Sequence, residues 1–186
     1  GIPDYRGPDA PPRRRPPIQH REFLDDPRTR ARYWARAMLV NPDADDLFGR
    51  TNINDMPSQL ARLHEDGVRA TAEYLHSLGA EPGDASPPDA ALVEQGRGIY
   101  YRRCTACHLG PRDPAATPED LEAMADADAP DLTGWGSRAW LREQITNPAA
   151  RSHYGTRNAM PAFAEELAGR DLEYVVERVR LLRTAP

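Results

Sequence analysis

The feature that most constrains the fold of this chain is the segment Cys104-Thr105-Ala106-Cys107-His108, which holds both cysteines of its 186 residues. Two thiols separated by two residues and followed by an imidazole form the pattern that attaches haem covalently, with thioether bonds from the thiols and iron coordination by the histidine. A buried macrocycle must then form part of the core. This agrees with a hydrophobic fraction of 39%, which is lean for a chain of this length.

The same two-cysteine spacing also occurs in zinc sites and in thiol oxidoreductases. A zinc site needs further ligands, and the chain has no other cysteine. The remaining histidines show no paired ligand spacing; they are His20, His64, His76 and His153. The sequence therefore favours haem over zinc or disulfide chemistry.

The apolar periodicity predicts helices and no strand, so we expect an all-α fold. The expected helices are Arg28–Val40, Glu65–Leu78, Asp89–Arg103, Pro118–Ala125, Arg138–Thr146 and Arg170–Leu182. Proline-rich stretches at Pro8–Pro17 and Glu81–Pro88 are expected to be extended linkers.

An internal repeat runs through the chain. The segment from Trp34 to Asn41-Pro42 recurs 106 residues later, from Trp140 to Asn147-Pro148. Phe48-Gly49 then matches Tyr154-Gly155, and Met56-Pro57 matches Met160-Pro161 at a spacing of 104. We predict two tandem helical domains, with residues 1–80 as the first, 81–89 as the linker and 90–186 as the second. The alternative is two unrelated helical hairpins.

Residues Ala90–Arg183 resemble the class I c-type cytochromes. The resemblance rests on Gly96 and Tyr100 ahead of Cys104, and on Asn158-Ala159-Met160-Pro161-Ala162-Phe163, which is similar to the distal loop of that family. It implies that haem c lies between an N-terminal and a C-terminal helix, with His108 and Met160 as its axial ligands. Met124 is the rival methionine within this half.

Four further side chains are candidates to line the haem edge and bind its propionates, because they combine apolar bodies with hydrogen-bond donors. They are Tyr154, Arg157, Trp135 and Trp140. Each could equally be a core aromatic or a solvated arginine. Ligation by histidine and methionine leaves no open coordination position, so we expect electron transfer rather than catalysis by the chain itself.

The first predicted domain contains Met56-Pro57 but no cysteine. By the repeat spacing, the counterpart of His108 falls at Ile2, so an attachment motif is expected at or just before Gly1. We expect a second haem there, with Met56 as its ligand, only if an upstream motif exists. Otherwise the first domain is expected to serve as a docking module.

The charge pattern points to a protein partner. A formal charge of -5 excludes a strongly basic nucleic-acid binder. The segment Leu109–Gly134 carries seven acidic residues against Arg112 alone. Such a segment would steer a basic redox partner if it flanks the haem edge, and would otherwise be a solvated loop.

No run of about 20 apolar residues is present, so no membrane span is expected in this chain. An export signal or anchor is expected to be removed or to lie upstream, which places the chain in the periplasm or at the extracytoplasmic face of a bacterial membrane. The expected role is a carrier domain or subunit of a respiratory or photosynthetic oxidoreductase complex.

The segment Asp131–Trp140 is similar to that of cytochrome c domains attached to quinol-oxidising cytochrome bc-type complexes. Two alternatives remain at this point, namely the cytochrome subunit of a periplasmic dehydrogenase and a haem-based gas sensor.

Overall fold

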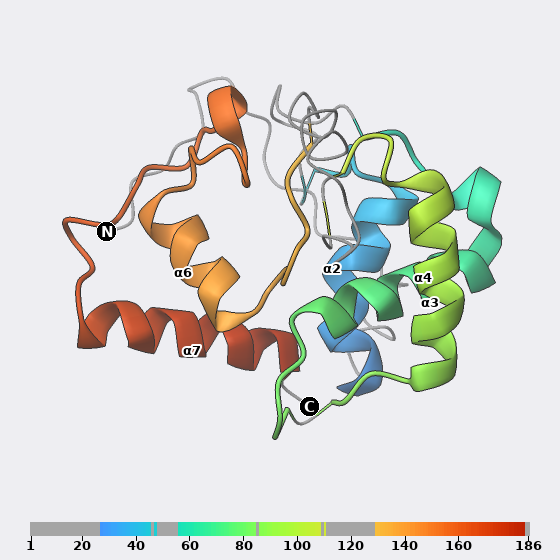
Figure 1. Cartoon of the computed structure of the whole chain (residues 1–186), viewed down its shortest axis with the longest axis horizontal. Helices are drawn as coiled ribbons and strands as arrows, with labels where there is room; N and C mark the ends of the chain where they lie inside the picture. The colour runs from blue at the N-terminus through green and yellow to red at the C-terminus, as the bar shows by residue number, and fades with distance from the viewer. Residues whose placement is uncertain are drawn as a thin grey trace, which may run out of the picture.

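The computed structural model describes residues 27–45, 47, 56–84, 86–108, 110 and 129–184. Its α-helices are α2 (Pro27–Val40), α3 (Leu60–Leu78), α4 (Ala90–Arg103), α6 (Arg138–Thr146) and α7 (Arg170–Thr184), with a short 3-10 helix, η2 (Gly155–Arg157) (Figure 1). The described residues contain no strand, which confirms the all-α prediction. The expected helix Pro118–Ala125 lies outside the described residues.

The helices begin and end where the local chemistry favours it. The Asp89 carboxylate accepts hydrogen bonds from the first amides of α4, and the Ser137 hydroxyl accepts one from Trp140 N at 3.2 Å. The helix α6 ends at Thr146, and its C-cap Asn147 directly precedes Pro148, which cannot donate a backbone hydrogen bond. Within the described residues, none of these helices is both long and apolar enough to cross a bilayer.

The helices form two groups, which Figure 1 shows side by side. In the first group, α3 packs against both α2 and α4; in the second, α6 packs against α7, and α7 also touches α2. Each group has its own apolar core. The first core consists of Ala35, Leu39, Val68 and Ala72, and the second of Leu141, Ile145, Leu172 and Val176.

The repeat seen in the sequence is also a repeat of backbone hydrogen bonds. Gln59 N donates to Leu39 O at 2.7 Å, and Phe163 N donates to Ile145 O at 3.0 Å. Each bond fastens the loop that carries a methionine to the end of the preceding helix. The turns after the two Asn-Pro pairs also match, since Leu47 N donates to Ala44 O as His153 N donates to Ala150 O.

The helix α4 crosses α3 with almost no space between the backbones. A Cβ atom added at Gly96 would lie 2.0 Å from the carbonyl oxygen of Ala70 and 2.8 Å from Cβ of Tyr74. Only glycine permits this approach. Among the described helices, α4 makes no contact with α6 or α7.

The helix α4, which follows the predicted linker, therefore packs on α3, the last helix of the first repeat. It does not pack on α7, the last helix of the second repeat. The sequence repeat shows which segments are alike, but it does not say which copies pair. Here a buried ion pair favours the first copy. Arg32 of α2 binds Glu73 of α3, and Glu73 Oε1 also accepts from Asp89 N at 2.6 Å, at the start of α4.

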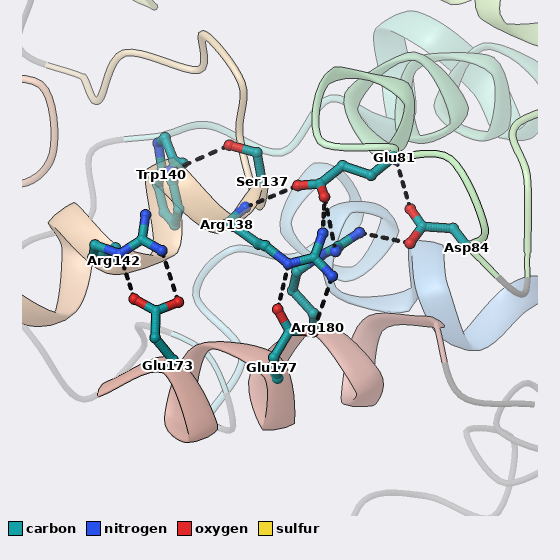
Figure 2. Close-up of polar contacts among 9 residues, drawn as sticks. All are labelled: Glu81, Asp84, Ser137, Arg138, Trp140, Arg142, Glu173, Glu177 and Arg180. Atoms are coloured by element: carbon teal, nitrogen blue, oxygen red, sulfur yellow. Dashed lines mark hydrogen bonds and ion pairs between the residues drawn. The ribbon is translucent and has the colours of Figure 1, made fainter. Parts of the chain in front are cut away.

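The segment between α3 and α4 is fixed by ionic contacts to the second group (Figure 2). Arg138 of α6 binds both Glu81 and Glu177, and Arg180 of α7 donates to Asp84 at 2.6 Å and to Glu81 at 3.1 Å. Arg180 is buried, so loss of its carboxylate partners would leave a buried charge without compensation. This segment joins the two helix groups as well as the two helices next to it.

Candidate haem-attachment site

The attachment turn continues directly from the end of α4. Cys104 N donates to Tyr100 O at 2.8 Å, and the amides of Cys107 and His108 both donate to Cys104 O, at 3.0 and 2.8 Å. One turn therefore carries two thiols and an imidazole. Both thiols are free, and Cys104 is half-buried while Cys107 is exposed.

The imidazole of His108 is oriented by a backbone carbonyl, since its Nδ1 lies 3.1 Å from Pro130 O. Burial lowers the pKa of His108, so the ring is neutral at neutral pH. A neutral ring that donates its Nδ1 proton to Pro130 keeps an unprotonated Nε2, which is the form that binds a metal.

The chain on either side of this contact is closely packed. Gly110 has a φ of +72°, and a Cβ there would lie 2.0 Å from Thr133 Oγ1 and 2.4 Å from Asp131 Oδ1. The Asp131 carboxylate accepts from Thr133 N at 2.7 Å and closes the turn after Pro130. Sequence reasoning missed Pro130, although a proline followed by an Asp-x-Thr-Gly turn was the available signal.

Cys104 borders a cluster of buried residues, Tyr74, Tyr100 and Leu132. The rings of Tyr74 and Tyr100 pack with centroids 5.3 Å apart. Burial, with a smaller effect of Cys107, raises the pKa of Cys104 to about 11. A thiol with this pKa is protonated at neutral pH, unlike the reactive thiolate of a thiol oxidoreductase.

These residues fit a covalently held haem. The buried hydroxyl of Tyr100 has no hydrogen-bond partner in the described structure, which marks a place where a polar group of another molecule would be accommodated. A zinc centre has less support. Across the described ranges, no group of three or more His, Cys, Asp or Glu side chains converges on one point.

The structure separates the predicted site residues into two sets. Trp135 lies with the attachment turn, because it packs against the cluster that Cys104 borders. Met160, Tyr154 and Arg157 lie in the loop between α6 and α7. Trp140 lies between them, since its ring is 6.4 Å from that of Trp135 and 4.8 Å from that of His153, in the loop between α6 and α7.

Met160 is held within the second group. Asn158 fixes its backbone on both sides, donating from Nδ2 to Met160 O at 2.6 Å and accepting from Met160 N at 3.1 Å. The Met160 sulfur lies 3.5 Å from Nε2 of Gln144, on α6. Nearby, burial raises the pKa of Tyr154.

Met56 occupies the matching place in the first group. It packs against the core of α2 and α3, which Trp135 and Leu75 also border. Trp135 and Leu75 border the cluster around Cys104 as well. The rival Met124, the acidic residues from Asp113 to Asp128, and the residues at Phe48-Gly49 lie outside the described residues.

Comparison with known proteins identifies cytochromes. The profile of the family described as "Cytochrome C oxidase, cbb3-type, subunit III" matches residues 91–177. Cytochrome c6 of Bumilleriopsis filiformis is 30% identical over 89 residues, which cover 48% of this chain and 90% of that protein. The cbb3-type cytochrome c oxidase subunit CcoP of Azospirillum brasilense is 32% identical over 124 residues, covering 64% of this chain and 34% of the relative.

A likeness of another kind is to the NAD-dependent protein deacylase SIR4 of Monosiga brevicollis, which is 44% identical over 86 residues. These residues cover 42% of this chain and 27% of that protein, so the chain spans about a quarter of its length. No solved structure matches.

The described residues do not support a dinucleotide site. The glycine-rich fingerprint of such sites follows a strand and opens a helix. Here Gly96-Arg97-Gly98 lies inside α4, Tyr101 stands where the third glycine would be, and the described part of the chain has no strand. The attachment turn and the cytochrome relatives instead both indicate covalent attachment of haem.

Proposed function

Because the chain belongs to the family of class I c-type cytochromes, we propose that it carries single electrons through one haem c bound at Cys104, Cys107 and His108. The observation that supports this most directly is the turn itself, in which two free thiols flank an imidazole whose Nδ1 lies against Pro130 O. When bound, the haem supplies an iron that alternates between the ferric and ferrous states.

The residues of the chain would each contribute to this role. Cys104 and Cys107 would hold the macrocycle through thioether bonds, and the carbonyl of Pro130, by accepting the Nδ1 proton of His108, would leave Nε2 available to bind the iron. The buried cluster of Tyr74, Tyr100 and Leu132 excludes water beside Cys104. Because the Cys107 side chain is exposed, the haem edge joined to it would lie close to the surface, where electrons can pass to a partner.

A methionine sulfur is the proposed sixth ligand, and the resemblance to the family favours Met160. With one histidine and one methionine ligand, the haem iron would have no coordination position open to substrate. The proposal is therefore an electron carrier. The chain would act in an oxidoreductase complex rather than as a catalyst alone.

The proposed partner is a membrane-bound electron-transfer complex. Similarity to subunit CcoP and to the cbb3-type subunit III family supports a terminal oxidase assembly more than the quinol-oxidising complex suggested by Asp131–Trp140. The haem domain would then face the extracytoplasmic side of the membrane.

Redox titration of the haem-loaded chain tests the function. We expect one reversible one-electron transition, no binding of carbon monoxide by the reduced protein, and reoxidation by membranes that contain a cbb3-type oxidase. Tight carbon monoxide binding would instead indicate a gas sensor. Reduction by a soluble dehydrogenase with no exchange with oxidase membranes would indicate a dehydrogenase subunit.

A further inference from the structure

The attachment segment and the methionine that follows it in sequence lie in different helix groups. The helix α4 packs on α3, and among the described helices it touches neither α6 nor α7. Met160 lies between α6 and α7, with its sulfur 3.5 Å from Gln144 Nε2. Two methionines, Met56 and Met160, are therefore candidates for the sixth ligand of a haem bound at His108.

The first repeat contains the same elements as the second, namely a methionine loop between two helices that pack on each other. In both repeats a backbone hydrogen bond ties the methionine loop to the preceding helix, at Leu39 O in one and at Ile145 O in the other. Met56 follows α2 and precedes α3, as Met160 follows α6 and precedes α7. Among the described helices, α4 contacts only α3, the helix that follows Met56.

Side-chain packing connects Met56 with the attachment turn. Met56 borders the core of α2 and α3, and Cys104 borders the cluster of Tyr74, Tyr100 and Leu132. Trp135 and Leu75 pack against both of these cores. The connection between Cys104 and the half that holds Met160 is less direct, because Trp135 reaches the core of α6 and α7 only through Trp140.

The last helices of the two repeats confirm the asymmetry. Val68 and Ala72 of α3 match Leu172 and Val176 of α7 at the spacing of 104, because each pair faces the core shared with the preceding helix. At this spacing Ala70 matches Tyr174, and Tyr74 matches Arg178. Ala70 and Tyr74 are 0% and 4% exposed where α4 covers them, whereas Tyr174 is 62% exposed and Arg178 is exposed as well. The face that receives the attachment helix is therefore filled on α3 and free of α4 on α7.

We infer that Met56, from the first repeat, is the sixth ligand of the haem held by Cys104, Cys107 and His108. The haem unit is then permuted, with its distal half (α2, Met56 and α3) ahead of its attachment half in the sequence. This inference rests on the proposed function. It replaces Met160, the ligand expected from chain order, by its repeat counterpart.

The test compares Met56→Leu with Met160→Leu in the full haem-loaded chain. Leucine keeps the side-chain volume and removes the sulfur, so each variant serves as the control for the other. The readouts are the ferric sulfur-to-iron absorption band, the reduction potential and carbon monoxide binding. Retained covalent haem and unchanged far-ultraviolet circular dichroism show that a variant has folded.

We expect Met56→Leu to lose the sulfur-to-iron band, to gain carbon monoxide binding and to fall in potential, because the ligand that favours ferrous iron is gone. Met160→Leu should keep the parent spectrum. Loss of the band in Met160→Leu alone would overturn the inference and leave the proposed function intact. A parent protein with covalent haem but no such band would refute methionine ligation altogether.

Discussion

Tyr74→Ala should destabilise the protein far more than Tyr174→Ala. Both tyrosines follow a glutamate in the last helix of a repeat, and at the spacing of 104 Tyr174 stands at the place of Ala70, the residue on which Gly96 packs. Tyr74 packs on the ring of Tyr100, with centroids 5.3 Å apart, and is 4% exposed, whereas Tyr174 is 62% exposed. The pair therefore reports which of the two helices α4 covers.

The magnitude follows from burial. Truncation of a buried large aromatic side chain costs about 3–5 kcal/mol, and the tyrosine pair adds about 0.5–1.5 kcal/mol beyond its buried area. For Tyr74→Ala we expect a loss of about 3–4 kcal/mol in the free energy of unfolding. Tyr174→Ala removes an exposed ring that lies 5.7 Å from the guanidinium of Arg170, so we expect a loss within about 0.5 kcal/mol.

Urea unfolding of the two haem-loaded variants, followed by circular dichroism, measures the difference. The denaturant slope should stay constant, so that a shift in midpoint reports stability. Equal losses for the two variants, or a larger loss for Tyr174→Ala, would refute the packing of α4 on α3.

Two further predictions concern the helix crossing and pH. Gly96→Ala should lower the free energy of unfolding by about 1–3 kcal/mol, because its Cβ would lie 2.0 Å from Ala70 O. Gly98→Ala should raise it by about 1 kcal/mol through helix propensity, because its Cβ meets only the flexible end of the Arg102 side chain. Equal urea midpoints for the two variants would contradict the crossing of α4 on α3. Burial lowers the pKa of His153, whose Nδ1 has no hydrogen-bond partner in the described structure. Below about pH 6.5, His153 therefore binds a proton in the unfolded chain but not in the folded chain. The free energy of unfolding should then fall as pH drops through that value. His153→Phe should remove this part of the pH dependence, and a parent-like profile in the variant would contradict the assignment.

Local chemistry explains what could be predicted from the sequence. Apolar periodicity and capping residues such as Ser137 determine where the helices lie, and the Asn-Pro pairs mark their ends. The spacing of Cys104, Cys107 and His108 indicates haem because the chemistry of attachment dictates that spacing. The cytochrome relatives and the helical fold confirm both predictions at this level.

The pairing of segments could not be predicted in the same way. The helices α3 and α7 are counterparts in the repeat, with Val68 and Ala72 matching Leu172 and Val176, and either could receive α4. The structure distinguishes them by the contact of Glu73 with the amide of Asp89, at the start of α4. The Arg32–Glu73 pair itself recurs in the second repeat as Arg138–Glu177. The contact of His108 with the Pro130 carbonyl was also missed, because the Asp-x-Thr-Gly sequence after Pro130 indicates a turn but not which side chain its backbone will meet.

The mass of the intact chain under denaturing conditions tests the central claim most directly. Protein produced in cells that attach haem should carry the mass of one haem, and the Cys104→Ser, Cys107→Ser double variant should not. A parent chain at the mass of the polypeptide alone, or lighter by two hydrogens because Cys104 and Cys107 had formed a disulfide, would contradict the account.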